Sequence, residues 1–219
     1  MSWAPLWADA AGIPTLNEMV VRANARELIG SANSANEGTV LKHQLDLRTV
    51  YRPGELLETV PGLIVTQHSG EGKANQYFLR GFNLDHGTDL RITVDGMLVN
   101  QRSHGHGQGW ADTNFIIPEL IGNLQYMKGP YYAHQGDFSS AGAVSMGYVD
   151  KLPKGIASYG LGQQGFMRGL VTKSHEVGRG NVLYAVELLT KDGPWVKHED
   201  FKKFNVVLRY SQDTGSTKF

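Results

Sequence analysis

Short apolar segments with a period of two run through most of this chain. Residues 90–94 and 97–99 alternate apolar with polar side chains on either side of an Asp-Gly dipeptide at positions 95–96. A period of two predicts β-strands. The dipeptide predicts a tight hairpin, because both of its residues tolerate positive φ. In this hairpin Val94 would pair with Met97.

The same reasoning predicts a small mixed α/β region around this hairpin. A helix is expected after Pro53, where apolar positions share one face, and Pro61-Gly62 would end it. A second short helix is expected at residues 118–123, with Pro118 at its start. The remaining apolar segments predict strands at residues 63–66, 76–80 and 124–128.

After Pro153 the pattern changes to longer alternating segments separated by Gly, Asp and Lys. Weak alternation over about ten residues is typical of the wall strands of a membrane β-barrel. A soluble antiparallel meander would give the same pattern, so periodicity leaves both interpretations open. The expected strands are residues 157–164, 165–174, 181–191 and 205–212.

Composition excludes some classes of protein. The chain has 21 basic and 21 acidic residues, which gives no electrostatic argument for a nucleic-acid partner. It has no cysteine, which excludes disulfides and thiolate metal sites. No apolar run approaches the roughly 18 residues that a membrane-spanning helix needs.

The sequence contains no recognisable catalytic constellation. The unusual segment is residues 102–112, RSHGHGQGWAD, which combines two imidazoles, a guanidinium and an indole with three glycines. Two histidines separated by one residue share a face of extended backbone, so His104 and His106 are candidate transition-metal ligands. Three readings stay open: metal binding, contact with another ligand, and a solvated structural loop. Further ligand-type side chains are His68, Asp85, His86 and Asp89.

Several motifs, taken in order, resemble the plug domain of TonB-dependent outer-membrane receptors. The resemblance covers residues 51–150, from an entry helix and turn (ELLETVPGL) to a closing glycine-containing segment at 136–144. It departs from the family pattern at Gln125, where Glu is usual, and at Ala143, where Gly is usual. The residues that carry the plug motif are Arg80, Gly81, Asp95, Gly96, Lys128, Gly129, Pro130, Gly136 and Gly142.

The resemblance implies a fold and a division of the chain. The expected fold class is an α+β plug domain, a small mixed sheet with short helices at residues 40–152, followed by the start of an antiparallel transmembrane β-barrel at 153–219. Residues 1–11 are expected to be a signal-peptide remnant, and residues 12–39 a TonB-box-like segment with a flexible linker. The box-like residues are Glu18, Met19, Val20, Val21, Arg22 and Ala23. Because four strands cannot close a barrel, we expect the chain to be either a fragment of a longer receptor or a truncated gene product.

The resemblance also implies a function. It is energy-coupled uptake of a scarce ligand, such as an iron–siderophore or another metal complex, through the outer membrane of a Gram-negative bacterium. The partners would be the TonB complex, the ligand and the outer membrane; no nucleic acid, no catalysis and no cofactor beyond a metal carried in the ligand are expected. The candidate ligand-contacting residues in the apical loops are His68, Glu71, Lys73, Arg102, His104, His106, Gln108 and Trp110. Two alternatives are a soluble periplasmic binding module and a histidine-dependent metalloenzyme.

Overall fold

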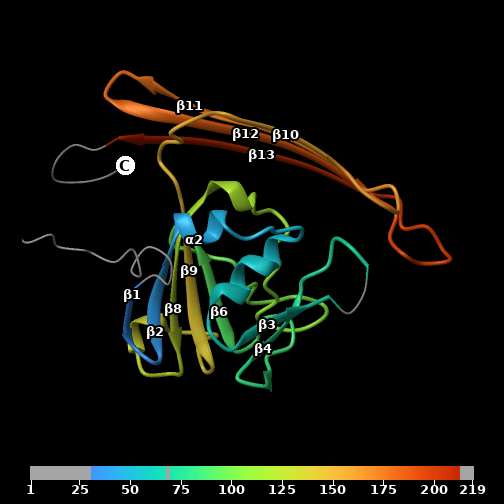
Figure 1. Ribbon diagram of the computed structural model, residues 1–219. Helices are drawn as coiled ribbons and strands as arrows, with labels where there is room; N and C mark the ends of the chain where they lie inside the picture. Colours follow the sequence, from blue (N-terminus) through green and yellow to red (C-terminus); the bar gives the residue numbers. More distant parts are fainter. Residues whose placement is uncertain (1–30, 68–69, 213–219) are drawn as a thin grey trace, which may run out of the picture.

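The computed structural model describes residues 31–67 and 70–212. Figure 1 shows two parts: a mixed domain of two small sheets with short helices, and a sheet of long strands that runs across it. We call this second sheet, β10–β13, the wall sheet. Residues 1–11, which we expect to be a signal-peptide remnant, lie outside the described residues, as do the box-like residues 18–23 and His68.

The larger sheet of the mixed domain has six strands in the order β1-β2-β8-β9-β6-β7. β6 pairs with β9 in parallel, and the other neighbours are antiparallel. The buried residues of β6, β8 and β9 form the core together with apolar residues from the smaller sheet. The strands are β1 (Ser31–Ser34), β2 (Glu37–Leu41), β6 (Leu90–Val94), β7 (Met97–Leu98), β8 (Ile121–Lys128) and β9 (Gly142–Tyr148).

The smaller sheet has the order β3-β4-β5, with strands at Leu63–Thr66, Gln76–Leu79 and Phe82–Asn83. One short α-helix, α2 (Lys42–Asp46), and three 3-10 helices complete the mixed domain. These are η1 (Pro53–Thr59), η2 (Pro118–Leu120) and η3 (Ala133–Gln135). None of the described helices is long and apolar enough to cross a membrane.

Two of the predicted plug motifs, Asp95-Gly96 and Arg80-Gly81, form tight hairpin turns. Asp95 and Gly96 have φ values of 48° and 78°, and Val94 pairs with Met97, as the sequence predicts. Arg80 and Gly81 make the same kind of turn between β4 and β5, with φ values of 54° and 79°. Both turns need the left-handed region, where glycine is free of Cβ strain.

The helix predicted after Pro53 is present as the 3-10 helix η1. Two local predictions are corrected. The expected flexible linker includes β1 and the start of β2, and β2 forms a ladder with β8; small polar residues suggested flexibility, but backbone pairing orders them here. The helix expected at residues 118–123 ends at Leu120, because Ile121 already pairs with Tyr148 in the sheet.

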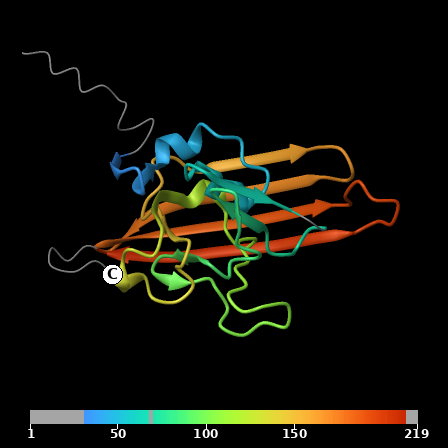
Figure 2. The same ribbon diagram turned by 90° about the horizontal axis from the view of Figure 1, so that it is seen from below.

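The wall sheet is a four-stranded antiparallel meander. Its strands are β10 (Ile156–Leu161), β11 (Met167–Val177), β12 (Gly180–Lys191) and β13 (Phe201–Gln212). The loops at 162–166 and 192–200 join strands at one end of the sheet, and the β11–β12 turn lies at the other. Figure 2 shows the four strands side by side, with the mixed domain against one of their faces.

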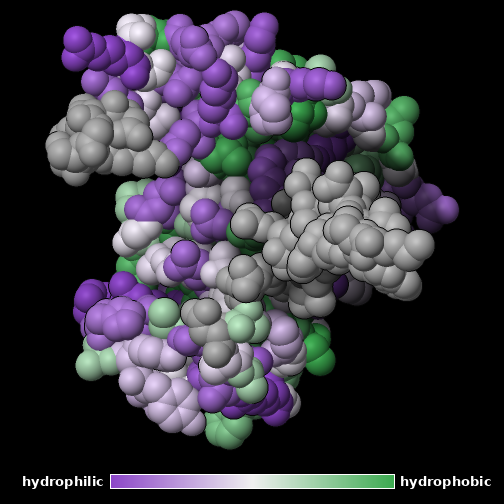
Figure 3. All heavy atoms as spheres, turned by 60° about the vertical axis from the view of Figure 1, so that its left-hand side comes forward, coloured by the Kyte–Doolittle hydropathy of each residue, from purple (hydrophilic) through white to green (hydrophobic). Residues whose placement is uncertain are grey.

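The two faces of the wall sheet differ in character. The inner face carries buried residues such as Leu170, Leu183 and Glu187. The outer face is mostly apolar and exposed, as expected of a barrel wall in contact with lipid and not of a soluble meander. Its exposed apolar residues are Tyr159, Leu161, Met167, Val171, Val177, Val186, Leu188, Phe204, Val206, Leu208 and Tyr210. By contrast, the side of the mixed domain visible in Figure 3 mixes hydrophilic residues with scattered hydrophobic ones.

Apolar packing and a charge network join the wall sheet to the mixed domain. The apolar contact consists of Ile117, Leu120, Leu152, Leu170, Leu183 and Ala185. Beside it, Arg168 on β11 makes a two-bonded ion pair with Glu119, at 2.6 and 2.9 Å. The Arg168 Nε also donates to Glu187, at 2.7 Å, and Lys203 pairs with the same carboxylate at 2.8 Å. We call these four residues the charge network.

The charge network determines how Glu119 titrates. Burial alone would raise its pKa, but the hydrogen bonds and positive charge of Arg168 outweigh burial and hold the pKa of Glu119 below its ordinary value. Glu119 is therefore ionised at neutral pH. Both side chains of the pair are largely withdrawn from solvent, with Arg168 17% exposed and Glu119 30% exposed.

Candidate functional site

The histidine-containing loop has a closed base. Gln101 and Trp110 form an antiparallel bridge, in which the Gln101 N–H donates to the Trp110 carbonyl at 2.8 Å. Gly109 has a φ of 80°, and a Cβ there would lie 2.9 Å from both Phe138 and the backbone of Thr88. Glycine is therefore required at this position. The bridge between Gln101 and Trp110 holds the two ends of the loop together.

Buried Asn100 organises the backbone under the loop. Its Oδ1 accepts a hydrogen bond from the Ile92 N–H at 2.7 Å. Its Nδ2 donates to the carbonyls of Gly87, Leu90 and Gly109 at 2.8, 2.9 and 3.0 Å. One side chain thus ties the segment before β6 to the end of the loop. The sequence offers no signal for this role, because an asparagine after a strand is ordinarily a turn residue.

Three histidines gather around Trp110, which is 8% exposed. The His104 ring stacks on the indole, with centroids 4.3 Å apart and planes 14° apart. The His106 ring meets the indole edge at 5.0 Å and the His86 ring at 4.6 Å. His86 reaches the cluster from the turn before β6. We call His86, His104, His106 and Trp110 the histidine cluster.

His86 is held in one orientation by backbone carbonyls. Its Nδ1 lies 2.9 Å from the Ala74 carbonyl and 3.1 Å from the Asn75 carbonyl. Because a carbonyl accepts but never donates, the ring proton is on Nδ1 and Nε2 carries the lone pair. Nε2 lies 3.6 Å from the Asp85 carboxylate. Burial, which outweighs the backbone bonds and the charge of Asp85, lowers the pKa of His86 and favours the neutral ring.

The two histidines predicted as metal ligands, His104 and His106, make different contacts in the structure. The His104 Nδ1 accepts the His106 N–H at 3.1 Å, and its ring lies flat on Trp110. His106 instead lies close to Asp85 and His86, with one ligand atom from each residue within 4.8 Å of the others. Sequence reasoning included Asp85 and His86 only as ligand-type residues, because the contact spans about twenty residues of chain.

The other loop residues occupy different places. Arg102 is exposed and pairs with Asp137 at 2.6 Å, and Gln108 is exposed as well. Lys73 is partly buried, and its carbonyl accepts a bond from Asn114 at 3.1 Å. Glu71 forms an ion pair with Lys191 at the end of β12. Glu71 therefore lies at the wall sheet. A few residues further along the chain, the backbone carbonyls of Ala74 and Asn75 contact His86 of the histidine cluster.

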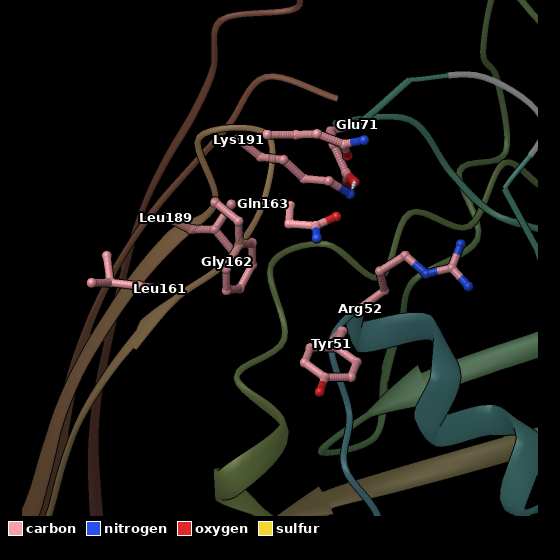
Figure 4. A pocket seen from close by; sticks show the side chains of 10 residues that line it. Tyr51, Arg52, Glu71, Leu161, Gly162, Gln163, Leu189 and Lys191 are labelled. Atoms are coloured by element: carbon pink, nitrogen blue, oxygen red, sulfur yellow. Dashed lines mark hydrogen bonds and ion pairs between the residues drawn. The ribbon is translucent and has the colours of Figure 1, made fainter. Parts of the chain in front are cut away.

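A cavity of about 590 Å³ lies where Glu71 meets the wall sheet. Figure 4 shows Glu71 and Lys191 pointing toward each other beside Arg52 and Gln163. The lining thus combines both signs of charge with amide groups and the apolar side chains of Leu189 and Phe166. Its position at the 162–166 loop places it at the same end of the wall sheet as the 192–200 loop.

The predicted plug-motif residues build turns and strand ends. Asp95 accepts the Tyr148 N–H at 3.1 Å and pairs with Arg209 of β13. Lys128, buried at the end of β8, donates to the Pro61 carbonyl at 3.3 Å; burial, followed by the charge of Arg80, lowers its pKa. Arg80 is exposed and bonds the side chain of Asn36. The remaining positions are Gly129 and Pro130 after β8, Gly136 at the end of η3 and Gly142 at the start of β9.

The model of the TonB-dependent receptor plug domain matches residues 31–143, which is more than half of the chain. The chain belongs to this family. The mixed domain is its plug, and the wall sheet matches the first barrel strands of such receptors. The match includes β1 and β2, in agreement with their place in the larger sheet. Members of the family are transport receptors and not enzymes, which removes the metalloenzyme alternative.

Solved structures with the same fold include three transporters or receptors. The copper transporter OprC has a TM-score of 0.62 and 20% identity over 83% of this chain and 29% of its own. The FrpB iron transporter from Neisseria meningitidis gives 0.60 and 19%, over 82% of this chain and 30% of its own. The siderophore receptor PirA from Pseudomonas aeruginosa gives 0.57 and 14%, over 84% and 33%. The chain spans about a third of the length of these proteins, and the similarity supports the fold alone.

Proposed function

We propose that this chain supplies the plug and the first wall strands of an outer-membrane receptor that takes up a scarce metal complex in a TonB-dependent manner. The observation that carries the proposal is the plug docked on a wall sheet whose exposed face is apolar. A sheet with that face outward needs lipid or detergent around it, and its buried charge network faces the plug. Siderophore and copper receptors among the structures with this fold support a metal complex as the class of cargo.

In this proposal the two ends of the wall sheet have different roles. Glu71, the cavity beside it and the 192–200 loop lie at one end, which would face the outside and meet the ligand. The Asp95-Gly96 hairpin contacts Arg209, which lies toward the opposite end, near the β11–β12 turn. That end would face the periplasm, where residues 18–23 would pair as a strand with TonB.

A proline substitution tests the energy-coupling segment. Val20→Pro removes one backbone N–H, so the segment can no longer complete a β-ladder with TonB. We expect cells that express the variant from the native gene to bind ligand at their surface while accumulating none. The measurement is surface binding and accumulation of radioactive zinc, copper and a ferric siderophore, run in parallel with wild-type cells.

A matched control uses Pro outside the segment. Asn24→Pro lies next to the box-like residues and should leave accumulation at the wild-type level. Normal accumulation by the Val20→Pro variant would remove residues 18–23 from the coupling step, whereas loss of surface binding as well would mean that the substitution disturbs folding or export.

A further inference from the structure

The group Asp85, His86 and His106 has the composition of a transition-metal site. Its ligand atoms, one from each residue, lie within 4.8 Å of one another. Two imidazole nitrogens and one carboxylate oxygen suit Zn²⁺, and also Cu²⁺, Ni²⁺ and Co²⁺. They suit Mg²⁺ and Ca²⁺ poorly, since these ions prefer oxygen ligands throughout. The ligand types of this group therefore favour divalent transition metals over Mg²⁺ and Ca²⁺.

His86 is already arranged as a ligand. Its Nδ1–H is held by the carbonyls of Ala74 and Asn75, which fixes the tautomer and the ring plane. A metal-binding histidine commonly has its other ring nitrogen held in this way. The lone pair of Nε2 is then on the side of Asp85, 3.6 Å from its carboxylate. Because His86 is 2% exposed, its position is set by the plug core and not by solvent.

The other two ligands stand at the surface and have room to adjust. A tetrahedral ion with bonds of about 2.0–2.1 Å needs its ligand atoms roughly 3.3 Å apart, closer than they now are. Gly105 and Gly107 flank His106, and a Cβ added at either would meet nothing within 4 Å. A small movement of the loop can therefore bring His106 to the ion. Asp85 is 53% exposed, which leaves an entry path.

We propose that Asp85, His86 and His106 bind one divalent transition-metal ion on the plug, with a coordination position left for water or a donor atom of the incoming ligand. His104 is not a ligand in this arrangement. It bonds the His106 backbone and stacks on Trp110, so it positions the loop that carries His106. The site can be tested without transport. Only the further step, that the bound ion is cargo, rests on the proposed function.

Zinc titration of the purified protein in detergent, with a chromophoric chelator as competitor, tests the site. We expect one Zn²⁺ per chain. Asp85→Asn, which keeps the shape of the side chain, and His106→Ala should each raise the Kd by about tenfold or more, the loss expected when a metal site is deprived of one partner. Both positions are exposed, so the thermal midpoint should stay close to that of wild type.

The matched control is His134→Asn, at an exposed histidine of η3 that is outside the group. This variant removes an imidazole and leaves the loop that carries His106 unchanged. Its Kd should remain within about twofold of wild type, as for an exposed residue outside the site. As a second readout, the electron paramagnetic resonance spectrum of bound Cu²⁺ should show two imidazole nitrogens in wild type and one in His106→Ala.

Two outcomes would overturn the proposal. One is the absence of stoichiometric zinc binding. The other is a Kd that neither Asp85→Asn nor His106→Ala changes, which would assign the ion to other histidines among the eight in the chain. Neither outcome bears on TonB-dependent uptake, which is measured in cells and is compatible with a cargo that binds elsewhere.

Discussion

Replacing Arg168 with alanine should destabilise the protein by about 3–5 kcal/mol, the cost of removing one partner from a buried ion pair. Arg168 bonds Glu119 of the plug and Glu187 of β12, and Glu187 is 1% exposed. Without the guanidinium, Glu119 loses both of its bonds to the wall sheet. Glu187 keeps only Lys203 as an ionic partner among the described residues. The measurement is the free energy of unfolding in detergent from a denaturant titration, followed by the fluorescence of the tryptophans.

An exposed ion pair on the same strand provides the control. Glu176 of β11 pairs with Lys151, and the two side chains are 74% and 52% exposed. Lys151→Ala should therefore leave the free energy of unfolding unchanged within error. If Arg168→Ala costs no more than Lys151→Ala, the charge network has no stabilising role.

Replacing Asn100 with alanine should have an effect of similar size for a different reason. The variant leaves the Ile92 N–H without an acceptor and the carbonyls of Gly87, Leu90 and Gly109 without this donor. Each buried polar group without a partner costs about 1–3 kcal/mol, so a total loss of at least about 3 kcal/mol is expected. The same denaturant titration measures it. Zinc affinity should fall as well, because Asn100 fixes the base of the loop that carries His106.

Two comparisons isolate the hydrogen bonds of Asn100. Asn100→Asp keeps the acceptor for Ile92 and loses the three donated bonds, so most of the destabilisation should remain. Asn123→Ala, at an exposed position of β8, should change stability by less than about 0.5 kcal/mol. A cost for Asn100→Ala equal to that of Asn123→Ala would mean that water or a backbone shift replaces the lost bonds.

The sequence predicts those helices, strands and turns whose conformation depends on residues close together in the chain. The alternation around the Asp95-Gly96 turn gives the β6–β7 hairpin, because turn conformation and side-chain period are both local properties. The wall strands are recognised for the same reason. The sequence does not predict β1 and β2, because β2 is ordered by pairing with β8, more than eighty residues away in sequence, and β1 in turn pairs with β2.

The candidate site divides in the same way. The composition of residues 102–112 predicts a ligand-binding loop, and it identifies the two histidines and Trp110 as candidate ligand contacts. The sequence does not predict that His106 lies beside His86. The carbonyls of Ala74 and Asn75 orient His86. Asn100 bonds the carbonyls of both Gly87 and Gly109, and so holds the segment with His86 against the base of the loop with His106. Spacing along the chain encodes none of these contacts, because they form only when the plug is folded.

The accumulation of radioactive zinc, copper and a ferric siderophore by cells tests TonB-dependent uptake most directly. Four strains are compared, with and without this protein and with and without TonB. Uptake of at least one cargo should require both proteins, and removing TonB should reduce accumulation to the level of cells that lack the receptor. Accumulation that depends on this protein and is the same without TonB would contradict the account.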